Sequence, residues 1–254
     1  MIGVFRSEWL KLRSVRSNLF MLASIFVLGV GLGALLTGVV PSTARRNGEP
    51  SPLQNPFDRL GIALAGLNLA MLLAGVFGVH LVGQEYRFST IRATFAAVPK
   101  RLAVMGSKLS VLVVTIAVVG GLTLGAAYFV GGAILSGRGF PIDTSVEGFG
   151  RTLLGTFLLI LVYAVAGYGV GMIVRQPIGG IILVLAFPLI IESIVVGFLK
   201  SSAGKWMPYN AGSQLLARRP DPDLFGPWAG YFYFVGFALL LCVIGAILTN
   251  RRDA

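Results

Sequence analysis

Two ionisable side chains interrupt otherwise apolar stretches of the sequence, and these are the residues best placed to do chemistry. Glu192 follows Pro188 by one helical turn in one such stretch, and His80 lies near the end of another. An ionisable group inside a membrane span is costly and often marks a proton relay or a ligand site. The structural alternatives are a neutral, hydrogen-bonded Glu192 that holds a helix broken at Pro188, and a His80 that sits at the water interface.

The sequence contains no motif for covalent catalysis, metal binding or nucleotide hydrolysis. Gly204 and Lys205 resemble part of a phosphate-binding loop, but the earlier glycine is misplaced and Trp206 stands at the Ser/Thr position. HExxH, GxSxG and paired intramembrane aspartates are also absent from the sequence. The lone cysteine, Cys242, excludes an intrachain disulfide. We therefore expect a chain that is not an enzyme and binds no cofactor or metal itself.

The composition is that of an integral membrane protein. The chain is 56% hydrophobic and 12% charged, with a mean hydropathy of +0.84, which is too apolar for a soluble domain. A helix needs roughly 20 apolar residues to cross a hydrocarbon core about 30 Å thick. Six stretches meet this length and predict an all-α fold of six transmembrane helices in one domain, 1–254: 19–40, 60–83, 109–135, 153–174, 178–199 and 228–249.

The segment 1–18 predicts a helix that lies in the plane of the membrane. Its apolar residues share one helical face, and its basic residues are spread over the rest. The apolar residues are Ile2, Phe5, Trp9 and Leu12, and the basic ones are Arg6, Lys11, Arg13 and Arg16.

The stretch 84–108 is the longest polar segment on the side expected to face the cytoplasm. Between 86 and 99 its apolar residues recur at helical spacing, which predicts a short amphipathic helix, and Pro99 ends it because proline cannot donate a backbone hydrogen bond. The alternative is a solvated basic loop. The apolar residues of the predicted helix are Phe88, Ile91, Phe95 and Val98.

The distribution of Lys and Arg predicts that both termini are cytoplasmic. With that orientation the inner side holds the larger share of the 21 basic residues, in agreement with the positive-inside rule. The basic pI of about 10.4 then indicates attraction to anionic lipid. It does not indicate nucleic acid, because no basic and aromatic groove is present to read bases.

Two further patterns predict how the chain packs: an apolar segment before the last span, and pairs of glycines within the spans. The segment from 200 to 228 is too apolar for an exposed loop, and we expect part of it to dip back into the membrane interface; its candidate residues are Pro208, Tyr209, Asn210 and Gly212. Glycine pairs one turn apart let helices approach closely. We expect this of Gly29 and Gly33, Gly121 and Gly125, and Gly167 and Gly171.

The polar stretch after the second expected span carries an acid, a Thr-x-Arg, a Pro-x-Arg and a later lysine, namely Glu85, Thr90, Arg92, Pro99, Arg101 and Lys108. With the in-plane helix and six spans, this pattern resembles the permease subunits of ATP-binding-cassette transporters of the type-2 exporter group, over essentially the whole chain. Ser89 departs from the glycine that the family often has there. The stretch 207–212, MPYNAG, is similar to permeases linked to peptide-antibiotic or multidrug export.

The resemblance implies a mechanism and partners. In that family the helix after the second span docks in a separate ATPase subunit, which binds ATP and Mg. Two permeases, identical or related, pair in the inner membrane of a bacterium and export an amphipathic, drug-like, peptide-antibiotic or lipid-like substrate. The residues implied to couple to the ATPase are Glu85, Arg87, Phe88, Thr90, Ile91, Arg92, Phe95, Val98, Pro99 and Arg101.

Two other functions remain open from the sequence. One is a secondary transporter driven by protons through Glu192 and His80. The other is a membrane scaffold or sensor that transports nothing and binds a partner through the same amphipathic helix.

Overall fold

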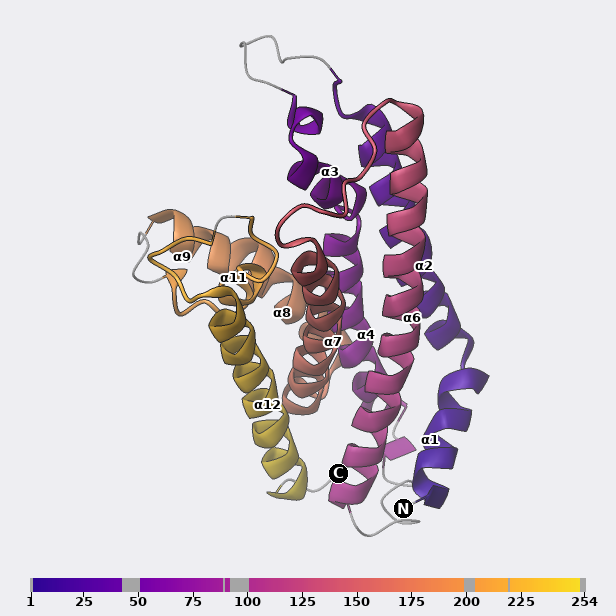
Figure 1. The fold of residues 1–254 in the computed structure, drawn as a ribbon. Helices are drawn as coiled ribbons and strands as arrows, with labels where there is room; N and C mark the ends of the chain where they lie inside the picture. Colours follow the sequence, from indigo (N-terminus) through magenta and orange to yellow (C-terminus); the bar gives the residue numbers. More distant parts are fainter. Residues whose placement is uncertain are drawn as a thin grey trace.

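The computed structural model describes residues 2–42, 51–88, 90–91, 101–198, 204–218 and 220–251. They form a bundle of long helices (Figure 1). The elements are α1 (Ile2–Ser14), α2 (Arg16–Val39), η1 (Pro52–Gln54), α3 (Pro56–Ala63), α4 (Leu67–Arg87), α6 (Arg101–Gly137), α7 (Phe149–Val174), α8 (Pro177–Ala186), η2 (Phe187–Ile191), α9 (Glu192–Phe198), α11 (Pro208–Ser213) and α12 (Pro227–Arg251).

The predicted all-α class is confirmed, and no strand occurs among the described residues. Six segments are long and apolar enough to cross a membrane, and each overlaps one of the six expected ranges. The chain is therefore a multi-pass membrane protein. The six segments are Arg16–Val39, Pro56–Arg87, Arg101–Gly137, Phe149–Val174, Pro177–Phe198 and Pro227–Arg251.

Helix α6 is longer than a membrane span requires. Its 37 residues reach about 55 Å at roughly 1.5 Å per residue, against a hydrocarbon core of about 30 Å. In Figure 1 it runs from the level of α1 to the level of α3. The helix therefore projects beyond the hydrocarbon core.

Helix α1 is separate from the first span and lies against the beginning of α6. Val15 adopts an extended conformation between α1 and α2, with φ −90° and ψ 112°. The buried amide of Asn18 donates to the Leu12 carbonyl oxygen at 3.3 Å, so the bend is held by a hydrogen bond across it. The orientation of α1 in the plane of a membrane stays a prediction.

Helices α4 and α7 form the centre of the bundle, and of the six segments theirs are the most buried. Glycines allow their backbones to touch. A Cβ added at Gly167 would overlap the Gly75 carbonyl oxygen, and one added at Gly78 would overlap the Ala164 carbonyl oxygen. A Cβ at Gly171 would lie 3.1 Å from the Val79 backbone. Small residues thus set the distance between the two central helices.

The glycine pairs of the sequence divide into two groups. Gly29 and Gly33 on α2 pack closely, as the spacing predicts: a Cβ at Gly29 would lie 2.9 Å from Thr123 Cγ2 of α6, and one at Gly33 would lie 3.0 Å from the Ala63 carbonyl oxygen of α3. On α6 the prediction is wrong for Gly125, where a Cβ would meet nothing within 4 Å among the described residues, whereas a Cβ at Gly121 would lie 3.7 Å from Phe157 of α7. Spacing alone does not say which face of a helix meets a neighbour.

The fifth span is interrupted at Pro188. Helix α8 ends at Ala186, the residues Phe187–Ile191 form a π-helical turn, and α9 begins at Glu192. A proline inside a helix removes one backbone donor and crowds the preceding turn, and a π turn accommodates both changes. The interruption places Glu192 at the start of a new helix.

The α4–α7 contact gives a test of the fold. Gly167→Ala should lower the midpoint of thermal unfolding in detergent and cost at least about 1–3 kcal/mol, because the new methyl group meets backbone that has no room to move. The matched control is Gly125→Ala, which adds the same methyl group where nothing lies within 4 Å and should be neutral or slightly stabilising. Equal stability of the two variants would contradict the packing described here.

Candidate functional site

Glu192 caps the short helix α11 from a distant point in the chain. Its Oε1 accepts a hydrogen bond from the Tyr209 backbone N–H at 3.0 Å, and its Oε2 accepts one from the Asn210 N–H at 2.8 Å. The first N–H groups of a helix have no partner within the helix. The residue before α11, Met207, has no side-chain oxygen to accept them. The carboxyl group of Glu192 fills that role, and its side chain is only 3% exposed.

Three aromatic rings hold α11 against α7 and α12. The Tyr163 ring of α7 lies edge-on to the Tyr209 ring, with centroids 4.8 Å apart, and both rings contact Phe234 of α12. Gly212 is required in this packing because a Cβ there would lie 2.7 Å from Phe234 Cδ1. The segment predicted to dip back into the membrane interface therefore packs against two span helices at this point.

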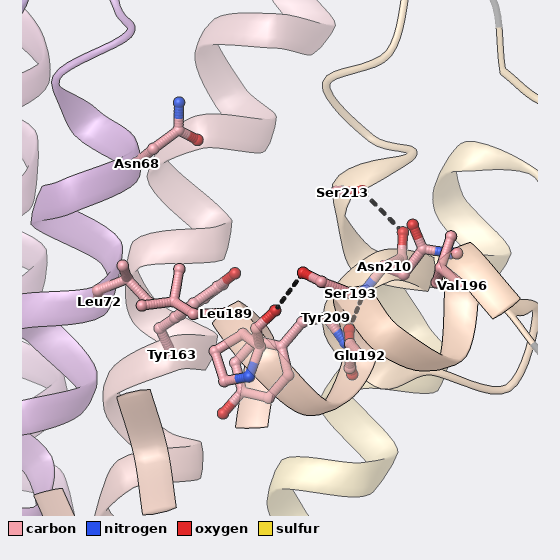
Figure 2. Close-up of a pocket in the computed structure, with 12 residues that line it drawn as sticks. Asn68, Leu72, Tyr163, Leu189, Glu192, Ser193, Val196, Tyr209, Asn210 and Ser213 are labelled. Atoms are coloured by element: carbon pink, nitrogen blue, oxygen red, sulfur yellow. Dashed lines mark hydrogen bonds between the residues drawn. The ribbon is translucent and has the colours of Figure 1, made fainter. Parts of the chain in front are cut away.

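Helices α4, α7 and α11 and the segment 188–197 line an open hollow of about 450 Å³. Figure 2 shows Asn68 and Leu72 on α4 across from the segment that carries Leu189, Glu192 and Val196. Polar groups in a membrane span usually face a protein interior or a water-filled cavity and avoid lipid. Several polar residues line this hollow: Asn68, Tyr163, Glu192, Ser193, Asn210 and Ser213.

A cluster of four charged side chains joins three helices at the other end of α4. Lys108 of α6 donates hydrogen bonds to Glu8 Oε2 of α1 and to Glu85 Oε1 of α4, the latter at 2.9 Å. Lys11 of α1 donates to Glu8 Oε1 at 2.7 Å and to Glu85 Oε1 at 3.1 Å. The Lys108 side chain is 3% exposed. We call these four residues the ionic cluster.

The ionic cluster contains two acids and two bases, so its formal charges balance. A buried ion is tolerated only when it is paired and hydrogen-bonded, and Lys108 has a carboxylate from each neighbouring helix. Glu85 Oε2 has no hydrogen-bond partner in the described part of the chain, so its carboxylate relies on Oε1. A displacement of α4 relative to α6 would break the contact between Lys108 and Glu85 and leave Glu85 with Lys11.

The pKa values of the two α1 residues shift in opposite directions. Burial by itself raises the pKa of Glu8, but Lys108 and Lys11 outweigh burial, so the pKa lies below the ordinary 4.5. Burial by itself lowers the pKa of Lys11, but its hydrogen bond to Glu8 and the charge of Glu85 outweigh burial, so the pKa lies above the ordinary 10.5. The fold therefore favours the charged form of both groups.

The ionic cluster lies directly beside the connection that was predicted to be an amphipathic helix. Phe88 follows the end of α4 and is 68% exposed, and the Arg87 guanidinium lies 5.5 Å from its ring centroid. Ile91 is 3% exposed, so Phe88 and Ile91 do not share one buried face. Thr90 Oγ1 donates to the Glu85 carbonyl oxygen at 3.4 Å, which ties the connection to the cluster.

The remaining predicted coupling residues fall into two groups. Arg101 begins α6 and donates to the Thr249 carbonyl oxygen of α12 at 3.1 Å. Arg92, Phe95, Val98 and Pro99 lie outside the described residues.

His80 and Glu192 are not brought together. His80 Nε2 lies 3.3 Å from Ser17 Oγ of α2, whereas both oxygens of Glu192 accept backbone N–H groups at the start of α11. In the part of the chain that the structure describes, no hydrogen bond joins the two. Their separate partners give each side chain a structural role.

Sequence reasoning missed Glu8 altogether and assigned Lys11 only to a basic helix face. One signal was present: Glu8 is the only acid in the first 18 residues and stands one turn before Lys11. An acid at that spacing forms an ion pair on a helix. The partner role of Lys108 required the tertiary structure, since it lies 100 residues away from Glu8.

Comparison with known proteins assigns no family. No protein-family model matches the chain, and no curated protein matches it closely enough to count as a relative.

The ionic cluster gives a test based on unfolding free energy. Lys108→Met should destabilise the protein by about 3–5 kcal/mol, because two buried carboxylates lose a shared counter-ion. The double variant Glu8→Gln/Lys108→Met should cost less than the sum of the two single variants. The control is Arg13→Met, which removes an exposed base on α1, the helix that carries Glu8. It should leave the free energy of chemical unfolding unchanged. Additive costs in the double variant would show that Glu8 and Lys108 do not interact.

The lowered pKa of Glu8 gives a test of pH dependence. Because its folded value lies below its unfolded value, the stability it contributes is present above pH of about 4.5 and is lost as pH falls through the folded value. Amide hydrogen exchange of α1, corrected for the intrinsic effect of pH, should therefore accelerate on acidification. Glu8→Gln should remove that acceleration and already exchange faster at neutral pH. Exchange of α1 that does not respond to acid in the native chain would contradict this account.

Proposed function

We propose that this chain is the membrane-spanning subunit of an ATP-driven exporter of the type-2 ATP-binding-cassette group. The observation that carries the proposal is the path of α4. Asn68 and Leu72 near the start of α4 line the hollow around Glu192, and Glu85 near its end belongs to the ionic cluster. One continuous helix thus joins a cavity at membrane depth to the connection at which a partner would act.

The packing of α4 supports movement of the helix as one unit. It has 21 residues, which is about 31 Å of helix, and close glycine contacts at Gly75 and Gly78 fix its middle to α7. A rigid helix transmits displacement from one end to the other without absorbing it by bending. Force applied at the connection after Arg87 would therefore reach both α7 and the hollow.

The ionic cluster extends this coupling to three helices. Lys108 binds α1 through Glu8 and α4 through Glu85, so the two ends of the connection, which leaves α4 and enters α6, are tied together. In the proposal a separate ATPase subunit binds ATP and Mg and presses on this connection. This chain converts the movement into a change in the hollow. A second copy or a related permease completes the pathway.

The distribution of charge supports a cytoplasmic location for this end. Contacts from Arg101 to Thr249 and from Arg175 to Leu248 place the end of α12 beside the beginning of α6. Helix α1 is joined to the same end through Lys108. Basic residues concentrate on the cytoplasmic side of membrane proteins. Those near this end include Arg6, Arg13, Arg16, Arg87, Arg101, Arg175 and Arg251.

The composition of the hollow supports an amphipathic substrate. Apolar Leu72, Leu189 and Val196 lie beside polar Asn68 and Ser193 around one cavity. Its volume of about 450 Å³ falls in the range of sites for drug-sized molecules, about 300–1,000 Å³. In the proposal this substrate leaves the cytoplasm, and the protein lies in the inner membrane of a bacterium.

Phe88 provides the test of the proposal. An ATPase should copurify with the chain from native membranes. Phe88→Ala should weaken that association by about tenfold or more, because an exposed aromatic side chain that becomes buried against a partner is often an interface hot spot. Substrate-stimulated ATP hydrolysis of the reconstituted complex should fall with it. The control is Phe129→Ala, which truncates a side chain of similar exposure, 73% against 68%, on α6 away from the connection.

Two results would contradict the proposal. One is unchanged association and unchanged stimulation in Phe88→Ala. The other is transport by vesicles that lack any ATPase and are supplied only with a pH gradient, which would favour the proton-driven alternative.

A further inference from the structure

The hollow around Glu192 adjoins a second hollow of about 340 Å³, and Asn68 and Ser213 line both. The second hollow lies between α3, α4, α7 and the segment after α11. It is near the beginning of α4, whereas the ionic cluster is near the end of that helix. Most of its wall is apolar: Phe57, Leu64, Leu67, Met71 and Leu216. The two hollows together offer a polar compartment and an apolar compartment side by side.

Glu192 is the single acidic or basic residue among those that line the two hollows in the described part of the chain. It forms no ion pair with any described Lys or Arg, whereas each acid of the ionic cluster has two basic partners. Its two hydrogen bonds come from neutral backbone N–H groups. A buried carboxylate without a counter-ion is costly, and among the described residues no Lys or Arg side chain supplies one to Glu192.

The carboxyl group retains the capacity to bind a ligand. Each carboxylate oxygen has two acceptor sites, and the backbone of α11 uses one on each oxygen. Figure 2 places Glu192 in the same wall as Ser193 and Asn210, whose side chains offer further polar contacts. A cation in the hollow would meet one acidic side chain and no Lys or Arg among the described residues that line it.

We propose that the two hollows form one binding site for an amphipathic organic cation, with its positive charge at Glu192 and its apolar part along Leu64, Met71 and Leu216. The claim that this site holds the exported substrate rests on the proposed function. The claim that the site binds a cation does not. An anion would be repelled by Glu192, and a neutral molecule of the same shape would leave the carboxylate without a counter-ion. The site therefore selects by the sign of the charge.

The experiment uses two ions of nearly the same shape and opposite charge, tetraphenylphosphonium and tetraphenylborate. Binding of each is measured to the full chain in phosphatidylcholine nanodiscs, with uptake by empty nanodiscs subtracted. The chain should bind the phosphonium at least about tenfold more tightly than the borate. Glu192→Gln, which keeps an acceptor oxygen and removes the charge, should abolish that preference. Glu147→Gln removes an exposed acid outside the hollows and should leave the preference intact.

A second variant tests the apolar compartment without disturbing the cap of α11. Gly61 lines the second hollow, and a Cβ there meets nothing within 4 Å, so Gly61→Leu should fill space and weaken phosphonium binding several-fold. Gly125→Leu places the same side chain on α6, also in open space, and should bind as the native chain does. Melting temperatures near the native value establish that each variant is folded.

Equal binding of the two ions by the native chain would overturn the inference, and so would a full phosphonium preference in a folded Glu192→Gln variant. Either result leaves the ATPase assignment intact, because association with an ATPase is measured through Phe88. Conversely, cation binding with no copurifying ATPase would retain this site and remove the proposed export mechanism.

Discussion

The ammonium group of Lys108 lies between two carboxylates from two other helices, and the arrangement of the chain at this end depends on that contact. A lysine at 3% exposure is tolerated in an apolar bundle only if its charge is neutralised and hydrogen-bonded where it lies. Glu8 and Glu85 meet both needs. Because neither acid belongs to α6, satisfying one lysine fixes the positions of α1 and α4. At the opposite end of the bundle the charged contacts include hydrogen bonds from Arg138 to the carbonyl oxygens of Thr37 and Val40.

Close packing and charge therefore have different roles along α4. In its middle, Gly75 and Gly78 allow backbone contact with α7, which makes the helix pair stiff. At its end, Glu85 connects the same helix to α1 and α6. At its beginning, Asn68 and Leu72 lie in a cavity wall. The arrangement suits a component that passes movement along the bundle.

Glu192 combines the two possibilities that the sequence left open. It is a structural residue, since its oxygens cap α11 and Pro188 brings it to the start of a helix. It also lines a cavity in which its charge has no described counter-ion. Its hydrogen bonds to α11 explain why an acid is placed there. Its position in the cavity wall is the basis for the proposed binding of a cation. His80, which shared the proton-relay hypothesis, contacts Ser17 on α2 and has no part in this arrangement.

The sequence by itself determined the membrane class, the six spans and the interruption at Pro188, because these follow from local properties: the length of apolar runs and the missing N–H of proline. It also drew attention to Glu85, Lys108, Glu192 and the segment 208–212 as separate features. Only the tertiary structure showed that Lys108 pairs with Glu8 across 100 residues and that Glu192 binds the start of α11. It also showed that Gly125 faces none of the described helices. Each of these depends on which faces of the helices meet, and hydrophobic periodicity carries little of that information in a membrane, where lipid-facing and protein-facing sides are both apolar.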